Sequence, residues 1–390
     1  MVETTGAAAG GGAVGRLEDG RAVFVDGALP AERVAIELTV DKKRFARGVA
    51  VQVLDPSPGR VAPPCSALAA GCGGCDLQHA TPELQREMKT QVVLDALTRI
   101  GQVEPPTIAQ RELAATGFRT TVRAAVTADG RAAFRRHQSH DLVTPEDCLV
   151  AHPLAEELLV GGRFPAASEV VVRVGARTGE RLVIVAPSAR RTRLPGQSAD
   201  VTLVGSAKAA AASFHEQVAG RSWRISGPSF FQSRPDGADA LVEVVVAEVA
   251  RVVGQADCLV DLCAGVGLFA GTVPAARVVA VESNRGAAGD AAHNLADIDA
   301  RIDIYRLEQW TPVPADVVVA DPPREGLGAT GVGKVVATGA DLVMLVSCDS
   351  GSLGRDAGLL AAEGYRLDAV TIVDMFPQTH HVEVVSTFTR

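Results

Sequence analysis

The stretch CLVDLCAGVGLF, residues 258–269, decides the fold class of this chain. Its apolar first half predicts a buried strand, and the glycines at 265 and 267 predict a tight turn that opens a helix. About twenty residues past Asp261, a second apolar run, Val278–Val281, ends in Glu282. A strand, a glycine turn and an acidic end of the next strand are typical of α/β folds that bind a nucleotide-like cofactor.

The same stretch favours S-adenosylmethionine over NAD as the cofactor. Gly265 and Gly267 allow the backbone to approach a ligand, but the third glycine of a pyrophosphate-binding turn is absent. Glu282 is placed to accept hydrogen bonds from both ribose hydroxyls. The alternative is a glycine-rich turn without a ligand, which any α/β protein can contain. The sequence thus predicts a cofactor site at Asp261, Gly265 and Glu282.

Further apolar runs in the same third of the chain end in reactive side chains. Leu342–Val346 runs into Ser347-Cys348-Asp349, and Val317–Ala320 runs into Asp321-Pro322-Pro323-Arg324. Open α/β sheets hold their chemistry at the carboxyl ends of the strands, so the thiol and this carboxylate are expected to meet there together with Glu383. The alternative for Cys348 is an inert, buried packing residue.

The composition is that of a soluble globular protein with two or three domains. The chain has 390 residues, of which 47% are hydrophobic and 22% are charged. The start of the chain lacks a basic signal-peptide region, and no apolar stretch approaches the roughly 18 residues of a membrane span. We expect a cytoplasmic protein with no membrane contact and no obligate protein partner.

The net charge of −8 argues weakly against a nucleic-acid partner, but it does not describe local surfaces. The stretch from residue 119 to residue 136 contains a group of arginines and a single acidic residue, Asp129. This stretch predicts a basic surface, and the alternative is an ordinary solvated strand face. The arginines are Arg119, Arg123, Arg131, Arg135 and Arg136.

Four of the seven cysteines have the spacing of a metal or cluster site. Cys65, Cys72 and Cys75 form a C-x6-C-x2-C pattern among glycines, and Cys148 stands far downstream. Four thiolates suit either zinc or an iron–sulfur cluster, so the spacing leaves these two open. A disulfide is disfavoured in a reducing compartment.

Shifts in composition divide the chain into three predicted domains, residues 1–57, 58–235 and 236–390. Residues 11–53 alternate short apolar runs with turn signals, which predicts a small antiparallel barrel. Apolar spacing predicts a helix over 81–100, opened by Thr81 and Pro82. Strands are expected at 169–174 and 181–186, a helix-like stretch near 206–213, and repeated strand–helix alternation from Ala238 onward.

Taken together, the motifs resemble the bacterial uracil-C5 RNA methyltransferases that carry an N-terminal TRAM domain. This group contains the 23S ribosomal RNA and transfer RNA 5-methyluridine enzymes, and the resemblance spans nearly the whole chain. Besides the barrel-like start and residues 261–269, it is carried by Cys65-x6-Cys72-Gly-Gly-Cys75-x2-Gln78-His79, Ser229-Phe230-Phe231-Gln232, Asp321-Pro322-Pro323-Arg324, Ser347-Cys348-Asp349…Leu353-Gly354-Arg355-Asp356 and Asp374-Met375-Phe376-Pro377-x-Thr379-x-His381-Val382-Glu383.

The resemblance implies an α/β protein in three parts: a small TRAM, OB-like barrel, a central α/β domain with an iron–sulfur cluster, and a C-terminal Rossmann-like methyltransferase sheet. A four-iron, four-sulfur cluster is implied on Cys65, Cys72, Cys75 and Cys148. An RNA substrate and S-adenosylmethionine are implied as ligands. Implied cofactor contacts are Cys263, Leu268, Glu282 and Glu308, with Asp321 beside them and Gln232 at the cofactor or the uracil edge.

The implied reaction agrees with the chemistry of uracil. Its C5 is too weakly nucleophilic to take a methyl group from a sulfonium, and a thiolate that adds to C6 raises the electron density at C5. By resemblance, Cys348 is this nucleophile. Glu383 matches the base that removes the C5 proton so that the thiolate can leave. The alternative for Glu383 is a surface carboxylate at the start of the last strand.

Ribosomal RNA is favoured over transfer RNA as the substrate, because the barrel and cysteine elements together resemble the 23S ribosomal RNA enzymes. Transfer RNA remains the alternative substrate. A non-catalytic iron–sulfur protein that binds RNA is a second alternative, and the presence of both Cys348 and Glu383 argues against it. A DNA cytosine methyltransferase is disfavoured because its nucleophile lies in Pro-Cys, whereas Ser347 precedes Cys348 here.

Four positions depart from the family pattern. Cys263 and Ala264 replace an aromatic residue and a cysteine, and Leu268 replaces an Asn or Thr. We expect retained cofactor binding with an altered affinity, since these contacts partly involve the backbone. Asp349 replaces the usual Asn-Pro after the nucleophile, and its charge should raise the pKa of the Cys348 thiol unless the carboxylate points away.

Overall fold

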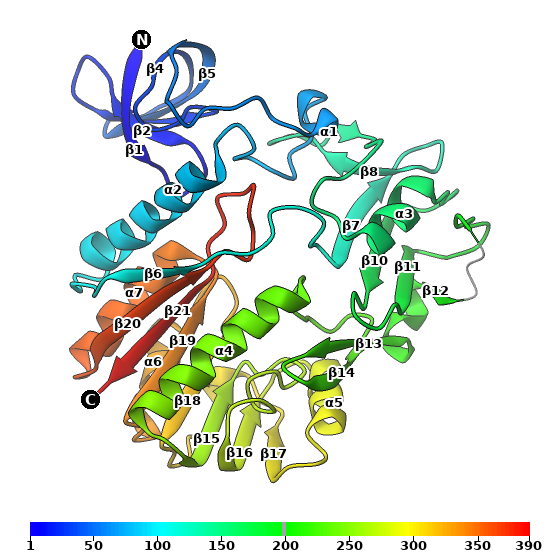
Figure 1. Cartoon of the computed structure of the whole chain (residues 1–390), viewed down its shortest axis with the longest axis vertical. Helices are drawn as coiled ribbons and strands as arrows, with labels where there is room; N and C mark the ends of the chain where they lie inside the picture. Colours follow the sequence, from blue (N-terminus) through cyan, green and yellow to red (C-terminus); the bar gives the residue numbers. More distant parts are fainter. Residues whose placement is uncertain (197–199) are drawn as a thin grey trace.

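The computed structural model describes residues 1–196 and 200–390 (Figure 1). Its first region is a closed barrel with the strand order β1-β2-β3-β5-β4. Alternate residues of its short strands, such as Val23 and Val25, are fully buried, which explains the alternating sequence pattern. The predicted small barrel is confirmed, although it is not wholly antiparallel, because β3 and β5 pair in parallel. Its strands are β1 (Val2–Ala7), β2 (Ala13–Arg16), β3 (Ala22–Asp26), β4 (Arg33–Asp41) and β5 (Phe45–Asp55).

The second region is a six-stranded sheet with the order β12-β11-β10-β7-β8-β9. Helix α3 (Pro153–Gly161) packs on it through Leu158 and Leu159. Strands β10 and β11 match the two predicted strands, and the predicted helix-like stretch is a 3-10 helix, η3 (Ser206–Ala211). The strands are β7 (Thr121–Val126), β8 (Ala132–Arg135), β9 (Leu142–Val143), β10 (Glu169–Val174), β11 (Arg181–Ala186) and β12 (Val201–Gly205).

The third region is an eight-stranded sheet with the order β17-β16-β15-β18-β19-β21-β20-β6. Neighbours from β17 to β19 are parallel, and β21 is antiparallel to β19 and β20. All residues of β18 and β19 are buried, which explains their continuous apolar sequence. The strands are β15 (Ala256–Leu262), β16 (Ala275–Val281), β17 (Ala300–Asp303), β18 (Val317–Ala320), β19 (Leu342–Ser347), β20 (Arg366–Val373), β21 (Val384–Thr389) and β6 (Ile108–Arg111).

Helices cover both faces of this third sheet and confirm the predicted strand–helix alternation. Helices α4 (Pro235–Val252) and α5 (Arg285–Asn294) contribute to one hydrophobic cluster. Helices α6 (Gly328–Ala337) and α7 (Ser350–Ala362) contribute to the other. Within residues 1–196 and 200–390, no helix has the length and apolar character needed to cross a membrane.

The segment between the barrel and the second sheet packs on the third sheet. Helix α2 (Pro82–Asp95) begins after Thr81, whose side chain accepts a hydrogen bond from Leu84 N, and continues as η1 (Ala96–Ile100). Leu97 is buried in the cluster of α6 and α7, and β6 pairs with β20. The packing thus departs from the predicted domain 58–235, because α2 needs an apolar partner and β6 covers an otherwise open sheet edge.

The glycine turn after β15 does not open the predicted helix. Residues 265–272 form successive turns, and positive φ angles of 63°, 57° and 94° at Cys263, Gly265 and Gly267 break the helical path. Asp261 stabilises these turns because its Oδ2 accepts a hydrogen bond from Ala270 N at 2.8 Å. The backbone therefore curls around the end of β15 and presents its amide groups there.

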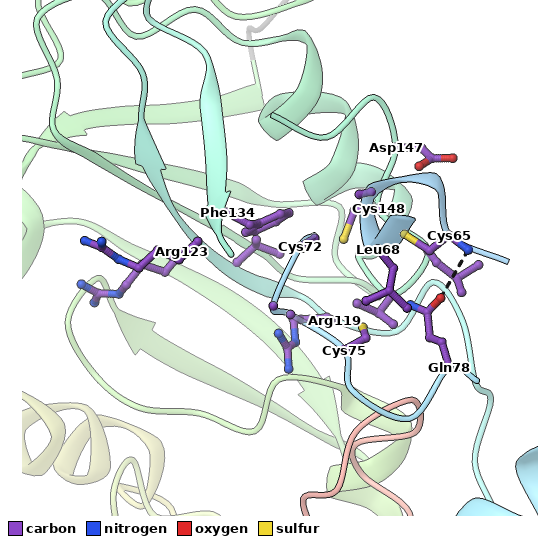
Figure 2. Close-up of a pocket in the computed structure, with 17 residues that line it drawn as sticks. Cys65, Leu68, Cys72, Cys75, Gln78, Arg119, Arg123, Phe134, Asp147 and Cys148 are labelled. Carbon is purple, nitrogen blue, oxygen red and sulfur yellow. Dashed lines mark hydrogen bonds between the residues drawn. The ribbon is translucent and has the colours of Figure 1, made fainter. Parts of the chain in front are cut away.

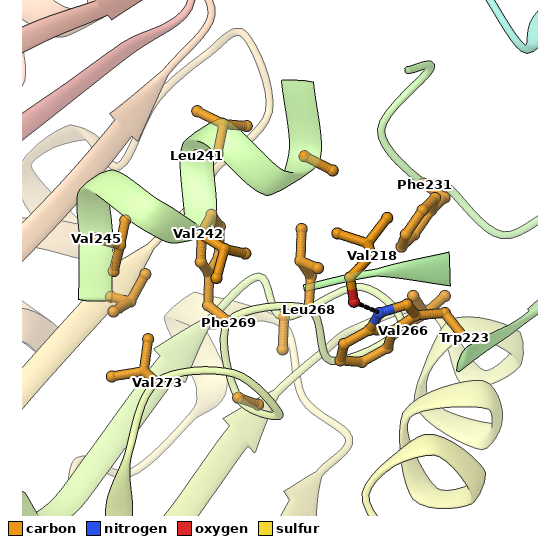
Figure 3. Packing of buried hydrophobic residues seen from close by; sticks show 14 of the residues in the cluster. Val218, Trp223, Phe231, Leu241, Val242, Val245, Val266, Leu268, Phe269 and Val273 are labelled. Carbon is orange, nitrogen blue, oxygen red and sulfur yellow. Dashed lines mark hydrogen bonds between the residues drawn. The ribbon is translucent and has the colours of Figure 1, made fainter. Parts of the chain in front are cut away.

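A hairpin of β13 (Ser213–Val218) and β14 (Arg221–Ser226) joins the second region to the third. Figure 3 shows Trp223 of this hairpin in the same hydrophobic cluster as Phe231, Leu268 and Leu241, the last from the buried face of α4. Trp223 Nε1 donates to Val218 O at 3.0 Å, which satisfies the polar group of a fully buried ring. This packing fixes residues 229–232 next to the glycine turn.

Candidate active site

A cavity of about 640 Å³ opens at the carboxyl ends of β15, β16, β18 and β19. The loop before α4 and the loop before β21 form its remaining walls. Eight residues predicted from the sequence line it, although they come from segments far apart in the chain. They are Gln232, Cys263, Gly265, Leu268, Glu282, Asp321, Cys348 and Glu383.

The glycine turn and Glu282 form one half of this cavity. Glu282 Oε2 accepts a hydrogen bond from Gly265 N at 2.9 Å, and its Oε1 accepts one from Asn284 N at 2.6 Å. Both oxygens are thus held by backbone amides; Oε1 also accepts from Ser283 Oγ at 3.4 Å, and Oε2 retains a lone pair for another donor. This half can bind a ligand with adjacent hydroxyl groups, which agrees with the ribose contact predicted for Glu282.

Two predicted cofactor residues do not line the cavity. Asp261 is completely buried, where its Oδ2 holds Ala270 N and its Oδ1 has no hydrogen-bond partner among the described residues. Burial raises the pKa of Asp261 to about 8. Glu308 lies in the exposed 3-10 helix η4 (Leu307–Gln309), and its neighbour Leu307 lines the cavity instead. In this structure Asp261 holds the glycine turn in place through its hydrogen bond with Ala270 N.

Cys348, Asp321 and Glu383 form the other half of the cavity. Glu383 is only 3% exposed, and Gln232 Nε2 donates to Asp321 Oδ2 at 3.3 Å. Burial, followed by the charge of Asp321, raises the pKa of Glu383 well above its usual range. Burial also raises the pKa of Asp321. Two close, buried carboxyl groups cannot both ionise at low cost, so the pair retains a proton at a pH where isolated carboxyls lose theirs.

The same surroundings keep Cys348 in its thiol form near neutral pH. Burial is the largest cause and the charges of Glu383 and Asp321 come next, so that the pKa of Cys348 rises to about 11. Arg324 opposes this shift with its positive charge. A reaction that uses Cys348 as a nucleophile must therefore remove the thiol proton within the site.

Alkylation can test this electrostatic environment. We predict that the reaction of Cys348 with iodoacetamide accelerates as the pH rises toward about 11, because the thiolate is the reactive form. Replacing Asp321 with asparagine removes a charge that raises the thiol pKa, so Asp321→Asn should be alkylated faster at a fixed pH of about 8. Peptide mass spectrometry measures the rate at Cys348 apart from the other thiols. Equal rates in the two proteins would contradict the prediction.

Asp349 does not act on the thiol in the way its sequence position suggested. Its Oδ1 accepts a hydrogen bond from Ser352 N at 2.8 Å and thereby caps helix α7. A carboxylate at a helix N-terminus is stabilised by the free amide groups and the helix dipole. The charges that raise the pKa of Cys348 are those of Glu383 and Asp321. The carboxylate of Asp349 thus points into the helix end.

Several cavity residues were not predicted as site residues. Tyr305 and Leu307 follow β17, and their place after a strand end could have identified them. Phe230, Phe231, Phe376 and His381 belong to motifs whose other members were singled out. His381 has its pKa lowered to about 4, mainly by burial, and is neutral near pH 7. The unpredicted lining residues include Arg119, Phe230, Phe231, Tyr305, Leu307, Arg324, Phe376 and His381.

The loop that carries His381 and Glu383 is anchored by earlier parts of the chain. Lys89 Nζ of α2 donates to Asp374 Oδ1 at 2.6 Å in a buried ion pair. Asp76, which follows Cys75, accepts from His380 N at 2.9 Å and also contacts His380 Nδ1. The position of this loop thus depends on the cysteine-bearing segment.

The four predicted cysteine ligands line a second cavity, of about 260 Å³ (Figure 2). Cys65, Cys72 and Cys75 come from the segment around α1 (Ser66–Ala69), and Cys148 comes from the loop before α3. Burial raises the pKa values of Cys72 and Cys148 and brings that of Cys75 to about 11. Within the described residues, no three His, Cys, Asp or Glu side chains are close enough to share one metal ion. The four thiols therefore border this cavity without converging on one point.

Comparisons with known proteins find relatives in sequence and in fold. Residues 2–51 match the family described as TRAM domain. A Streptomyces avermitilis protein named as an uncharacterized RNA methyltransferase is 36% identical, over 99% of this chain and 96% of its own length. An Alkalilimnicola ehrlichii protein named 23S rRNA (uracil(1939)-C(5))-methyltransferase is 32% identical, over 95% and 92%.

Among solved structures, the Pyrococcus abyssi tRNA (uracil-54, C5)-methyltransferase in complex with S-adenosyl-L-homocysteine has a similar fold. Its TM-score is 0.74 at 23% sequence identity, and the match covers 100% of both chains. At this identity, the likeness shows the shared fold.

Proposed function

Because this chain belongs to the RNA (uracil-C5-)-methyltransferases with a TRAM domain, we propose that it methylates C5 of a uridine in RNA through a covalent bond between Cys348 and C6 of the base. The enzyme is an S-adenosylmethionine-dependent RNA methyltransferase. The observation that carries the proposal is the meeting of Cys348, Asp321 and Glu383 in one cavity beside Glu282. A thiol and a base next to a ribose-binding carboxylate are what this reaction requires.

Cys348 is the nucleophile in the proposed mechanism. An unprotonated carboxylate of the Asp321 and Glu383 pair accepts the thiol proton and releases it to solvent before the later step, and the sulfur adds to C6 of the uracil. This addition breaks the C5–C6 double bond and places electron density on C5 and O4. Because a base inside a helix is inaccessible to the thiol, the target uridine must leave its stack.

Glu383 is the base that completes the reaction. After C5 has been methylated, it still carries its original proton, and the sulfur cannot leave until that proton is removed. Glu383 takes the proton, the C5–C6 double bond forms again, and the bond between Cys348 and C6 breaks. Gln232, which already contacts Asp321, lies where it can hold an edge of the uracil.

The cofactor occupies the half of the cavity formed by the glycine turn. S-adenosylmethionine supplies an electrophilic methyl group on a sulfonium. Glu282 would accept hydrogen bonds from its ribose, and the backbone at Cys263 and Gly265 would border it. Tyr305 and Leu307 offer flat and apolar surface for the adenine. Leu268 completes the proposed cofactor set, with Asp261 supporting the turn.

Ribosomal RNA is the proposed substrate. The support is the relative from Alkalilimnicola ehrlichii, whose name specifies uracil 1939 of 23S ribosomal RNA. Transfer RNA is the second candidate, because the P. abyssi enzyme that shares the fold is named for uracil 54 of transfer RNA. Mapping 5-methyluridine in the RNA of a strain that lacks this protein tests the choice. Loss of one ribosomal 5-methyluridine supports the proposal, and loss confined to transfer RNA overturns it.

We also propose that Cys65, Cys72, Cys75 and Cys148 hold a four-iron, four-sulfur cluster. The donor set suits it, because four thiolates are its usual ligands. The family resemblance favours a cluster over zinc, which would bind the same four thiolates at about 2.3 Å from each sulfur. Here they border a cavity of about 260 Å³. When bound, such a cluster can carry electrons or tie together the segments that hold it.

Metal analysis tests the cluster. We predict that protein purified without oxygen is brown and contains about four irons per chain. Cys72→Ser should lose the colour and lower the melting temperature, because the ligand segment also anchors the loop before β21. Cys258→Ser is the control, since this buried cysteine lies in β15 outside the cavity. Stoichiometric zinc in a colourless preparation would contradict the proposal.

The basic surface predicted from the arginines is tested by charge reversal. Arg135 ends β8 and Arg136 follows it, and both side chains are exposed. We predict that Arg135→Glu with Arg136→Glu weakens RNA binding and flattens its salt dependence, because phosphate contacts release counterions. Filter binding over a range of salt concentrations measures both effects.

A matched pair of reversals controls for the change in net charge. Arg99 and Arg366 are each 78% exposed and lie in η1 and at the start of β20. Reversing these two should leave RNA affinity nearly unchanged. If both double variants bind RNA like the wild type, the surface at Arg135 is only a solvated face.

A further inference from the structure

A third cavity, of about 510 Å³, adjoins the active site. It lies over strands β7, β10 and β11, and Thr121, Val171 and Ile184 of these strands line it. The residues it shares with the active-site cavity are Arg119, Phe230 and Phe231. The ring of Phe230 is 67% exposed at this boundary. A ligand that extends out of the active site past Phe230 would therefore enter the third cavity.

An unusual cation lies in the wall of this cavity. Arg173 is 3% exposed, and its Nη1 donates to three backbone carbonyls, those of Ser226, Gly227 and Ser229. Its Nε has no hydrogen-bond partner in the described part of the chain. Among the described residues, the Arg173 side chain takes part in no ion pair. Asp290 acts on the charge of Arg173 without forming an ion pair with it, since Asp290 is paired with Arg224. A buried guanidinium that forms no ion pair favours an anionic ligand nearby.

The remaining charges of the cavity have the same sign. Arg119 and Arg123 also line it, and Glu169 is the one acidic residue that does. Glu169 forms an ion pair with Arg123 at 2.7 Å, which leaves Arg119 and Arg173 without a carboxylate partner there. The cavity thus combines two cations that form no ion pair among the described residues with an exposed aromatic residue. This combination is typical of sites that bind single-stranded nucleic acid.

We propose that this cavity binds a nucleotide directly next to the methylated uridine, with its phosphate toward Arg119 and Arg173 and its base against Phe230 and Val171. The inference rests on the proposed function, because it extends the RNA from the active site. An RNA segment with its target base removed from the stack has an adjacent base that also lacks a stacking partner. The third cavity offers that base an apolar surface and a binding site separate from that of the target uridine.

Filling the cavity tests the proposal. Val171 is half-buried and faces the cavity from β10, so Val171→Trp places a ring where the nucleotide would lie. We expect its KM for RNA to rise about tenfold or more, since stacking and phosphate contacts are lost. Equilibrium dialysis should show unchanged S-adenosylmethionine binding. Leu94→Trp, on the exposed side of α2, is the control and should behave like the wild type.

Abasic RNA separates a direct contact from a structural effect. Substrates that lack the base on the 5′ or the 3′ side of the target uridine should be poorer for the wild type on one of the two sides. Val171→Trp should lose much less activity with that abasic RNA than the wild type does, because both changes remove the same contact. Should Val171→Trp unfold, Thr121→Trp from β7 replaces it. Equal losses in wild type and variant would overturn the inference.

The same experiments distinguish a failure of the proposed nucleotide site from a failure of the proposed function. If the wild type forms no 5-methyluridine in any RNA, the proposed function fails. If the wild type methylates RNA but is indifferent to loss of either neighbouring base, the function stands and the nucleotide site does not exist.

Discussion

Cys348→Ala abolishes methyl transfer to RNA if the proposed mechanism is correct. The expected loss of turnover is about 10⁴-fold or more, because the other thiol that lines the cavity, Cys263, belongs to the glycine turn in the cofactor half. The thiol lies at the end of β19 and contributes little to the packing of the core, so the variant should remain folded. Incorporation of a labelled methyl group into RNA under single-turnover conditions measures the effect.

A second cysteine variant controls for the loss of a thiol as such. Cys258 lies in β15 of the same sheet, is buried, and does not line the active-site cavity. Cys258→Ala should keep nearly full activity, since it removes only a small buried group. Substantial methylation by Cys348→Ala, for instance at a tenth of the wild-type rate, would show that the reaction proceeds without this thiol.

Glu383→Gln is expected to trap a covalent complex between the protein and methylated RNA. Glutamine retains the size of the side chain but cannot accept the C5 proton, so the steps before proton removal proceed and release does not. The variant should also remove a charge that raises the pKa of Cys348, which favours formation of the thiolate. A band that survives denaturing electrophoresis and carries the methyl label identifies the complex.

The trapped complex must depend on the nucleophile. Combining Glu383→Gln with Cys348→Ala should eliminate the band, and Glu363→Gln, at the exposed end of α7, should turn over like the wild type. Rapid turnover of Glu383→Gln would assign proton removal to another group. The neutral His381 is the first alternative, because it lines the same cavity.

The contacts of the cysteine segment suggest how distant parts of the chain contribute to catalysis. Asp76 follows one proposed cluster ligand and contacts His380, which lies three residues before Glu383. Lys89 of α2 holds Asp374 at the start of the same loop. Residues from the first quarter of the chain therefore help to fix the loop that carries the proposed base.

Local patterns were sufficient to predict most elements of the fold. The apolar runs before Asp321 and Cys348 are the buried strands β18 and β19, because a strand covered on both faces admits only apolar residues. Thr81 and Pro82 begin α2 as predicted. Helix caps, turns and strand burial depend on neighbouring residues, so they can be predicted without the tertiary structure.

The predicted helix after the glycine turn was wrong for a reason that lies outside the turn itself. The positive φ at Cys263 is a conformation that a cysteine rarely adopts, and Asp261 and the packing against Leu295 help to hold the turns that follow it. The position of β6 could not be predicted either, because its four residues join the sheet only by pairing with β20, more than 250 positions later.

The sequence by itself determined the α/β class, the barrel, the family and the residues at the strand ends, because each depends on motifs contained in short segments. Only the tertiary structure decided that Asp261 and Glu308 do not line the cavity and that Asp349 caps a helix. It also decided that a third cavity adjoins the active site at Phe230. These features depend on distances and orientations between remote segments, which are set by the packing of the whole chain.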